Sequence, residues 1–487
     1  MITLSNQSLS QLSVEVPKYD RQKVKVGIVH FGVGAFHRVH QAMYLDDLLN
    51  AGEAFDYGIC GVGVMPSDVK MRDALKAQDC LYTMVIKHPD GHYQARVIGS
   101  IVDYLFAPDN PKAVIECMAS ETVKIVSLTI TEGGYNFDHV TGEFNLDNPT
   151  IIHDLNSDEP KSAFGLITSA LALRRQKGLA PFTIQSCDNI QGNGDVAKKM
   201  FVAYAKAKDL DLGNWIEGNV AFPNSMVDRI APVTTPDDIQ MVQDRFEIND
   251  AFPSVCEPFC QWVIEDHFTS GRPNYEKVGA QLVDDVEAYE LMKLRLLNAS
   301  HQALTYFGYL AGYRYAHEVC SDSDFVEFLL NYMDLEATPT LRPIEGIDLH
   351  AYKRTLIERF ANPEVRDTLA RLCAESSDRI PKWLLPVIRE QLAMANPAIK
   401  RSVAVVASWA RYAEGKDEQG HDIVVVDRLK DELMAIAATQ ETDELAFIRN
   451  RNVFGDLIDN AYFVECYQEA LRMLKSQGAK QTVIQFK

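Results

Sequence analysis

The chain has 487 residues, of which 47% are apolar and 24% are charged, proportions that exclude a mainly disordered protein and predict two or three domains. The formal net charge of -20 makes non-specific binding to nucleic acid or to an anionic membrane surface unfavourable. No apolar run is long enough to span a membrane, the start lacks the pattern of a signal peptide, and the nine scattered cysteines suit reduced thiols. We therefore expect a cytoplasmic protein without nucleic-acid or membrane partners.

The first half of the chain alternates between short β-branched runs and stretches with helical spacing. Strands are expected at residues 24–31, 56–64, 94–99, 123–130 and 181–187, and helices at 35–51 and 164–178. This alternation is typical of a mostly parallel sheet with helices on its faces.

The second half is almost entirely helical in pattern. Helices are expected at residues 288–316, 323–334, 350–361, 381–413 and 461–477. The change of pattern places a domain boundary near residue 285. We expect an α/β domain at 1–284 and a mostly helical domain at 285–487.

The first expected strand leads directly into a glycine-bearing turn and then a helix. The turn consists of Phe31, Gly32, Val33 and Gly34. Glycines there allow close approach to a pyrophosphate, and the helix N-terminus offers free N–H groups to the anion. His37 stands where the usual fingerprint has a third glycine, and Gly-x-Gly turns also occur without a ligand, so dinucleotide binding and plain loop chemistry both stay open.

Two further strand ends carry polar residues that could contact a dinucleotide. Asp68 follows the second strand, where a carboxylate would bind ribose hydroxyls and repel a 2′-phosphate, although it could equally cap the next helix. Thr131 and Glu132 begin a glycine-bearing turn after the strand at 123–130, at the edge where open sheets bind ligands. Such a turn is also expected of an ordinary loop.

A mostly apolar helix after the domain boundary carries four polar residues on one side. At the α-helical rotation, Glu290, Lys293, Asn298 and His301 share a face. Burial disfavours the charged form of a lysine and lowers its pKa, which suits Lys293 to general-base work. Each residue alone has a structural explanation, such as a Lys293–Glu290 pair or a packed core histidine, but the combination favours a catalytic set.

Two polar runs in the first domain are also unusual. Asn189 follows the strand at 181–187, where its amide could donate to a substrate oxygen that develops negative charge. Asp228 and Arg229 lie in an apolar run, either as a buried ion pair or as ligands of a polyhydroxylated substrate.

Taken together, these segments resemble the polyol-specific long-chain dehydrogenases. The resemblance extends from about residue 20 to about residue 475, with its motifs in order, and its most specific part is the Lys293, Asn298 and His301 set. The runs that carry it are HFGVGAFHRVHQAMY, SLTITEGGYN, SCDNIQGNG, NSMVDRI, CEPFCQWVIEDHFTSGRP and MKLRLLNASHQALTYFGYLAG. The family implies a Rossmann-type N-terminal domain, a mostly helical C-terminal domain and an active site in the cleft between them.

The resemblance implies a metal-independent reaction in which a secondary alcohol gives hydride to NAD while a lysine takes the hydroxyl proton. Matched position by position, Lys293 would be the base, while Asn189 and Asn298 would hold the reacting oxygen. His301 would orient the reacting hydroxyl, and Glu290 would pass the proton outward.

The resemblance also implies which residues bind the substrate and the cofactor. Asp228 and Arg371 would contact sugar hydroxyls, and Asp68 would favour NAD over NADP. The expected cofactor-binding residues are Phe31, Gly32, Val33, Gly34, Asp68, Thr131 and Glu132. A metal held by His37 and His40, or by Cys256 and Cys260, lacks further ligands at suitable spacing.

Interconversion of D-mannitol and D-fructose is the expected reaction. Because members of the family are often monomeric, we expect a monomer. Reduction of D-fructuronate is the first alternative, because Arg371 and Arg379 could bind a carboxylate. D-Arabinitol oxidation is another alternative. A protein of another class, a nucleotide-binding sensor without turnover, would have no need of intact Lys293, Asn298 and His301.

Overall fold

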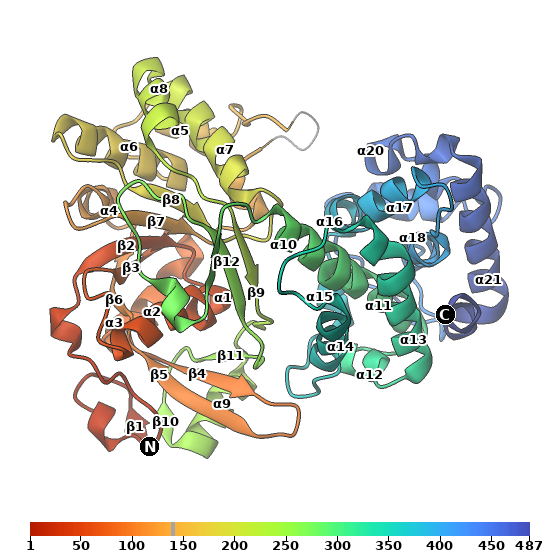
Figure 1. Ribbon diagram of the computed structural model, residues 1–487, viewed down its shortest axis with the longest axis horizontal. Helices are drawn as coiled ribbons and strands as arrows, with labels where there is room; N and C mark the ends of the chain where they lie inside the picture. The colour runs from red at the N-terminus through yellow and green to blue at the C-terminus, as the bar shows by residue number, and fades with distance from the viewer. Residues whose placement is uncertain (138–141) are drawn as a thin grey trace. The chain divides into compact units, whose positions relative to one another are not determined.

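The structure is a computed structural model that describes residues 1–137 and 142–487. It divides into two compact units, Met1–Glu287 and Ala288–Lys487 (Figure 1). Within the described residues, no helix has the length and apolar character needed to cross a membrane.

A five-stranded parallel sheet forms the centre of the N-terminal unit. In spatial order its strands are β6 (Ile101–Phe106), β3 (Gly58–Gly63), β2 (Val26–Phe31), β7 (Ile125–Leu128) and β8 (Thr183–Ser186). Every neighbouring pair is parallel. The predicted Rossmann-type domain with a parallel sheet is therefore confirmed.

Helices cover both faces of this sheet, which explains why its inner strands are mostly apolar. One face, with Val29 and Phe31, packs against α4, α6 and α7, and the other, with Ile28, packs against α1, α2 and α3. The helices of this unit are α1 (Ala35–Val39), α2 (Gln41–Asn50), α3 (Val69–Ala77), α4 (Pro111–Met118), α5 (Pro149–Leu155), α6 (Ala163–Gln176), α7 (Asn193–Lys208), α8 (Leu210–Asn219) and α9 (Pro236–Phe246). The helix expected at 35–51 is interrupted at His40, whose φ is -127° and ψ -95°.

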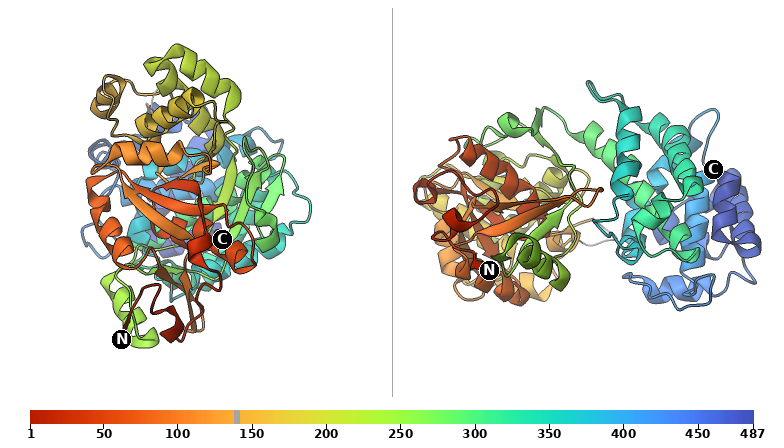
Figure 2. Two further views of the ribbon diagram at one scale, coloured as in Figure 1. Left: turned by 90° about the vertical axis from the view of Figure 1, so that its left-hand side faces the viewer. Right: turned by 90° about the horizontal axis from the view of Figure 1, so that it is seen from below.

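Three small sheets complete the unit. They are β1 (Ile2–Thr3) with β10 (Ile248–Asn249), β11 (Ser254–Cys256) with β4 (Tyr82–Lys87) and β5 (Tyr93–Ile98), and β13 (Gln281–Val283) with β12 (Gln261–Glu265) and β9 (Ser225–Asp228). The strand expected at 94–99 is β5, which pairs antiparallel with β4 in a hairpin outside the parallel sheet (Figure 2). The outer place beside β3 belongs to β6, whose alternating burial fits the edge of a sheet.

The C-terminal unit is helical, as predicted. Its helices are α10 (Glu287–Met292), a π-helical segment (Lys293–Asn298), α11 (Ala299–Leu310), α12 (Ala316–Cys320), α13 (Ser323–Tyr332), a second π-helical segment (Met333–Ala337), α14 (Leu349–Phe360), α15 (Leu369–Cys373), α16 (Ser376–Trp383), α17 (Leu385–Leu392), α18 (Lys400–Tyr412), α19 (Lys430–Ala437), α20 (Arg451–Phe454) and α21 (Ala461–Phe486). Helices α11, α18 and α21 pack together in one apolar core.

Glycine and proline account for most differences from the expected helix boundaries. The helix predicted to reach residue 316 ends at Leu310, because Gly312 adopts a φ of +103° and Tyr313 N–H turns back to Gly308 O at 3.0 Å. The helix expected at 381–413 is wrong, since this stretch forms α16, α17 and α18, with Pro386 in the first turn of α17. Beyond its expected end at 477, α21 continues through a kink at Gly478.

A buried carboxylate fixes the start of α18. Glu336, in the second π-helical segment, is fully buried and accepts hydrogen bonds from Arg401 N (2.8 Å), Ser402 N (2.8 Å) and Ser402 Oγ (2.6 Å). It therefore satisfies N–H groups that have no partner inside the helix.

Replacing this carboxylate should weaken the C-terminal unit. Glu336→Ala leaves buried donors of α18 unpaired, which costs about 2 kcal/mol and should lower the midpoint of thermal unfolding by about 4 to 8 °C. Calorimetry of the purified chain measures this shift. Glu358→Ala, on the exposed side of α14, is the matched control and should change the midpoint little. Equal shifts in the two variants would contradict the capping role.

Candidate active site

The turn between β2 and α1 has a backbone that only glycine can adopt at its centre. Gly32 has a φ of +92°, and a Cβ on it would lie 2.0 Å from Thr129 O. By contrast, a Cβ on Gly34 would stand in open space, 3.9 Å from Gly32 O. The turn therefore leaves a glycine-lined cradle at the start of α1. The residues present fit the pyrophosphate of a dinucleotide.

His37, which stands where the usual fingerprint has a third glycine, stacks on His30 of β2. The rings of His30 and His37 lie 3.4 Å apart at 12°. Thr129 Oγ1 donates to Gly32 O at 2.7 Å and lies 2.9 Å from His30 Nε2, so it accepts from that ring. Burial lowers the pKa of His30 to about 3, which keeps this ring neutral. The stack therefore joins α1 to β2 through their side chains.

His37 and His40 take part in the packing around α1. His37 Nδ1 lies 3.3 Å from Gln41 Oε1, and His40 Nε2 lies 2.9 Å from Gln261 O. Among the residues that the structure describes, no group of three or more His, Cys, Asp or Glu side chains is arranged to hold a metal ion.

Asp68 lies at the carboxyl end of β3, the strand beside β2. Its Oδ2 accepts hydrogen bonds from Val64 N and Met65 N, both at 2.9 Å. The side chain makes no capping bond to α3, but its bond from Met65 N forms part of a capping box on the 3-10 turn Pro66–Asp68 that leads into α3. The carboxylate folds back toward the end of its own strand.

The turns after β7 and β8 are joined by Asp188, which was not among the predicted site residues. Asp188 accepts hydrogen bonds from Thr131 N at 2.8 Å and from Ile130 N at 3.1 Å. It directly precedes Asn189, which is exposed at the end of β8. Asp188 could have been identified from the sequence by its position between the end of a strand and the candidate site residue Asn189.

The neighbouring pair Asp228 and Arg229 is buried at the end of β9. Arg229 donates to Val39 O at 2.8 Å, and its Nε and Nη2 donate to Glu257 O at 3.1 and 2.9 Å. These bonds tie β9 to the interrupted helix, so Arg229 has a structural role. Asp228 faces Gln261 across the β9–β12 pair.

In the C-terminal unit, the polar set of the sequence analysis lies on one buried helix. Lys293, Glu290, His301 and Asn298 are 5%, 6%, 7% and 8% exposed. The segment Lys293–Asn298 is π-helical, whereas a uniform α-helix was predicted. Because π-helical bonds join residues five apart, Asn298 comes closer to alignment with Lys293 than α-helical rotation predicts.

Neighbouring side chains hold this π-helical segment in place. Tyr332 Oη donates to Arg295 O at 3.0 Å. Arg295 donates to both carboxylate oxygens of Glu390, at 2.8 and 2.6 Å, and to Thr340 O at 2.6 Å. The segment is therefore anchored on the side away from the polar set by a two-pronged ion pair.

Asn298 has unused hydrogen-bonding capacity. Its Oδ1 is buried without a hydrogen-bond partner among the described residues. Such groups cost free energy in an apolar interior unless a ligand satisfies them. The ring of His301, one turn further, packs on Phe360 with ring centres 4.4 Å apart.

Helices α15 and α16 carry the arginines that were candidates for substrate binding. Arg371 donates to both carboxylate oxygens of Asp367, at 2.7 and 2.6 Å, and this pairing raises the pKa of Arg371 despite its desolvation. Arg379 donates to Arg371 O and Leu372 O, both at 3.2 Å. Burial lowers the pKa of Arg379.

Buried hydrogen bonds join these helices to α11. Tyr306 Oη bonds to Gln302 Oε1 and to Ser376 Oγ, each at 2.5 Å, and Thr305 Oγ1 donates to Leu369 O at 3.1 Å. The polar helix and the arginine-bearing helices are therefore positioned by one connected core.

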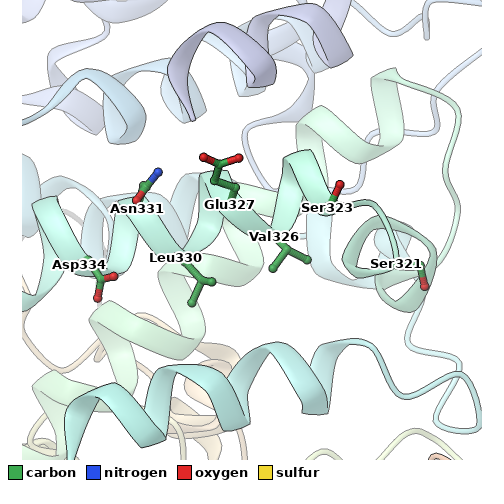
Figure 3. A pocket seen from close by; sticks show the side chains of 7 residues that line it. All are labelled: Ser321, Ser323, Val326, Glu327, Leu330, Asn331 and Asp334. Atoms are coloured by element: carbon green, nitrogen blue, oxygen red, sulfur yellow. The ribbon is translucent and has the colours of Figure 1, made fainter.

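A shallow surface depression on α13 is separate from these groups (Figure 3). Val326 and Leu330 form its apolar part, with Glu327 and Asp334 beside them. None of the predicted site residues lines it.

The structure gathers the predicted residues into two sets. Most of the N-terminal set lies at the carboxyl edge of the parallel sheet, where Phe31–Gly34, Asp68, Thr131, Glu132 and Asn189 follow four strands, and Asp228 ends β9. The C-terminal set comprises Glu290, Lys293, Asn298 and His301, with Arg371 on a helix packed against α11.

Comparison with known proteins agrees with this arrangement. The mannitol dehydrogenase Rossmann domain matches residues 26–277, and the mannitol dehydrogenase C-terminal domain matches residues 285–475. Mannitol 2-dehydrogenase of Pyrenophora tritici-repentis is 46% identical over 98% of this chain and 85% of its own. Mannitol dehydrogenase DSF1 of Saccharomyces cerevisiae is 44% identical over 96% of this chain and 93% of its own.

Two solved structures match over almost the whole chain. Pseudomonas fluorescens mannitol 2-dehydrogenase, in a ternary complex with NAD and D-mannitol, has a TM-score of 0.91 and 43% identity and covers 99% of both chains. A substrate-free D-sorbitol dehydrogenase has a TM-score of 0.91 and 35% identity, over 99% of this chain and 100% of its own. The chain belongs to the mannitol dehydrogenase family.

Proposed function

We propose that the chain is an NAD-dependent mannitol 2-dehydrogenase that interconverts D-mannitol and D-fructose. The observation that carries the proposal is full-length similarity to a protein solved with NAD and D-mannitol. The buried Lys293, Asn298 and His301 set supports it. We further propose a cytoplasmic monomer, in agreement with nine cysteines that are all free thiols.

The glycine-bearing turn and Asp68 suit the two ends of the cofactor's adenosine diphosphate half. Gly32 and Gly34 would let the backbone approach the pyrophosphate. Asp68 already uses Oδ2 for Val64 and Met65, which leaves Oδ1 to accept from ribose hydroxyls. A bound nicotinamide would supply the redox chemistry, taking hydride from C2 of the substrate in oxidation and giving it to C2 in reduction.

The chain's own residues would manage the proton and the developing charge. Lys293 Nζ takes the proton of the C2 hydroxyl during oxidation and returns it during reduction. The amides of Asn189 and Asn298 donate to the same oxygen as it becomes alkoxide-like. His301 orients this hydroxyl, and Glu290, one turn before Lys293, passes the proton outward.

Asp228 and Arg371 would bind the remaining hydroxyls of the open-chain sugar. Arg371 is held by Asp367 in a bidentate pair, which fixes its guanidinium and offsets its charge. A neutralised arginine is better suited to hydroxyls than to a carboxylate. This favours a polyol over a uronate.

Substrate choice can be measured directly. With NADH in excess, D-fructose should be reduced and D-fructuronate should react much more slowly, as followed by absorbance at 340 nm. Oxidation of D-arabinitol with NAD serves as the second comparison. Activity confined to fructuronate would assign the chain to uronate metabolism, and binding of NAD without turnover of any substrate would favour a sensor.

Loss of the proposed base should affect chemistry far more than cofactor binding. Lys293→Ala should lower kcat by about 10²- to 10⁴-fold, because no group remains to take the hydroxyl proton. The affinity for NAD, measured by calorimetry, should stay close to that of the wild type. Lys430→Ala, at an exposed position of α19, is the control. Wild-type turnover in Lys293→Ala would remove the lysine from proton transfer.

Cofactor preference should depend on the charge of Asp68. Asp68→Ser removes the carboxylate that would repel a 2′-phosphate, so the ratio of kcat/KM for NAD to that for NADP should fall by about tenfold or more. Asp73→Ser, on the exposed side of α3, keeps the wild-type ratio and controls for the loss of one charge. An unchanged ratio in Asp68→Ser would show that another residue selects the cofactor.

A further inference from the structure

One buried carboxylate connects the two turns that carry the proposed oxygen-binding and cofactor-binding residues. Asp188 is 7% exposed, and its carboxylate accepts from Thr131 N (2.8 Å), Ile130 N (3.1 Å) and Tyr135 Oη (2.7 Å). These donors all belong to the turn after β7. Asp188 itself begins the turn after β8.

The turn after β7 needs such a restraint, because its backbone is strained. Thr131 has a φ of +62° and a ψ of 169°, a conformation that β-branched residues rarely adopt. The N–H groups of Thr131 and of the preceding Ile130 both donate to one carboxylate. Glu132 follows immediately, so its place depends on the same restraint.

The main-chain carbonyl of Asp188 fixes the turn that contains Asn189. Asp188 O accepts from Ile190 N at 2.9 Å, which makes Asn189 the centre of a tight turn, and from Asn193 Nδ2 at 2.9 Å. Asn193 Nδ2 also donates to Ser225 O at 2.7 Å, and Ser225 N donates to Asn193 Oδ1 at 2.9 Å. The main chain of Asp188 is thereby fixed to β9.

We propose that Asp188 is a positioning residue whose ionised carboxylate holds the Thr131–Glu132 turn and the Asn189 turn in register, and that its protonation sets the acid limit of ketose reduction. The inference rests on the proposed function, because the roles of Glu132 and Asn189 come from it. A protonated carboxyl has lost one acceptor and gained a donor, so it can no longer accept from all three groups.

The acid limit is expected near pH 6. Burial raises the pKa of Asp188 to about 6, although the bonds from Tyr135, Thr131 and Ile130 oppose the rise. The titratable side chains that interact with it are Tyr135 and Cys187, and burial raises the pKa of both far above this range. Both therefore stay neutral at pH 6.

Stability and activity should respond to this protonation in opposite directions. The pKa of Asp188 is higher in the folded chain than the value of about 3.9 in an unfolded one, so ionisation opposes folding. The contribution of Asp188 to stability is therefore largest below pH 4 and is lost as the pH rises through 6. If Asp188 had only a structural role, its protonation would not lower the reaction rate over the pH range in which it stabilises the fold.

The test uses reduction of D-fructose by NADH between pH 5 and 8, because Lys293 is then needed in its protonated form and adds no acid limb. The wild type should lose kcat/KM about tenfold per unit below pH 6. Asp188→Asn should lose that acid limb, with a plateau about tenfold to a hundredfold lower, because the turns are no longer held. An acid limb that persists unchanged in Asp188→Asn would overturn the proposal.

A second variant keeps the carboxylate and shifts its titration. Tyr135→Phe removes a hydrogen bond that lowers the pKa of Asp188, so the acid limb should move to higher pH. Tyr204→Phe, at a buried tyrosine of α7, is the control and should leave the limb in place. Identical profiles for these two variants would contradict the proposed role.

Thermal unfolding of the chain without cofactor provides a readout that does not depend on activity. The midpoint of the wild type minus that of Asp188→Asn should increase as the pH falls from 7 to 5. A difference independent of pH would overturn the assignment of the titration to Asp188. If this difference depends on pH as expected but the wild type reduces no fructose, the proposed function is contradicted instead. The two failures are therefore distinguishable.

Discussion

The close approach of β2 to β7 at Gly32 is the constraint on which the site of the N-terminal unit depends. No side chain fits between Gly32 and Thr129 O, and the Thr129 hydroxyl joins the two strand ends by bonding to Gly32 O. His30, held neutral by burial, bonds to the same hydroxyl and carries the stacked ring of His37. The start of α1 is thus fixed to the end of β2. A phosphate-binding turn needs this rigidity, because its affinity comes from N–H groups that are already oriented.

In the C-terminal unit, the governing constraint is the free-energy cost of placing polar groups in an apolar core. Lys293 and Asn298 are almost completely buried on a helix whose other faces pack against aliphatic and aromatic side chains. The π-helical turn brings them nearer to one line, and Arg295 with Glu390 and Tyr332 holds that turn from its other side. An irregular helix that is anchored in this way is typical of a functional site.

The sequence allowed the parallel sheet, the glycine turn and the polar helix to be predicted, because each depends on short-range pattern. The β-branched run before Gly32 and the apolar spacing around Lys293 are examples. The π-helical turn could not be predicted, since α- and π-helices share the same residue types and differ only in which carbonyl each N–H reaches. Asp68 was ambiguous because a carboxylate near a helix start can bond forward or backward, and only the fold shows that it bonds back to Val64 and Met65.

Long-range partners explain the remaining differences. Arg229 donates to the carbonyls of Val39 and Glu257, contacts that no local pattern indicates. Asp188 bonds to Ile130 and Thr131, residues far away in the sequence that meet it only because β7 and β8 are neighbours.

These buried residues share one physical task. His30, Asp188 and Arg229 each use their hydrogen bonds to hold a turn or a strand end, while the residues proposed to contact ligands lie on the segments that they hold. Positioning of this kind matters because a displacement of about 1 Å in a reacting group can cost about a hundredfold in rate. A substitution that never touches the substrate can therefore be as damaging as one that does. Its effect should also depend on pH wherever the holding group, like Asp188, titrates near neutrality.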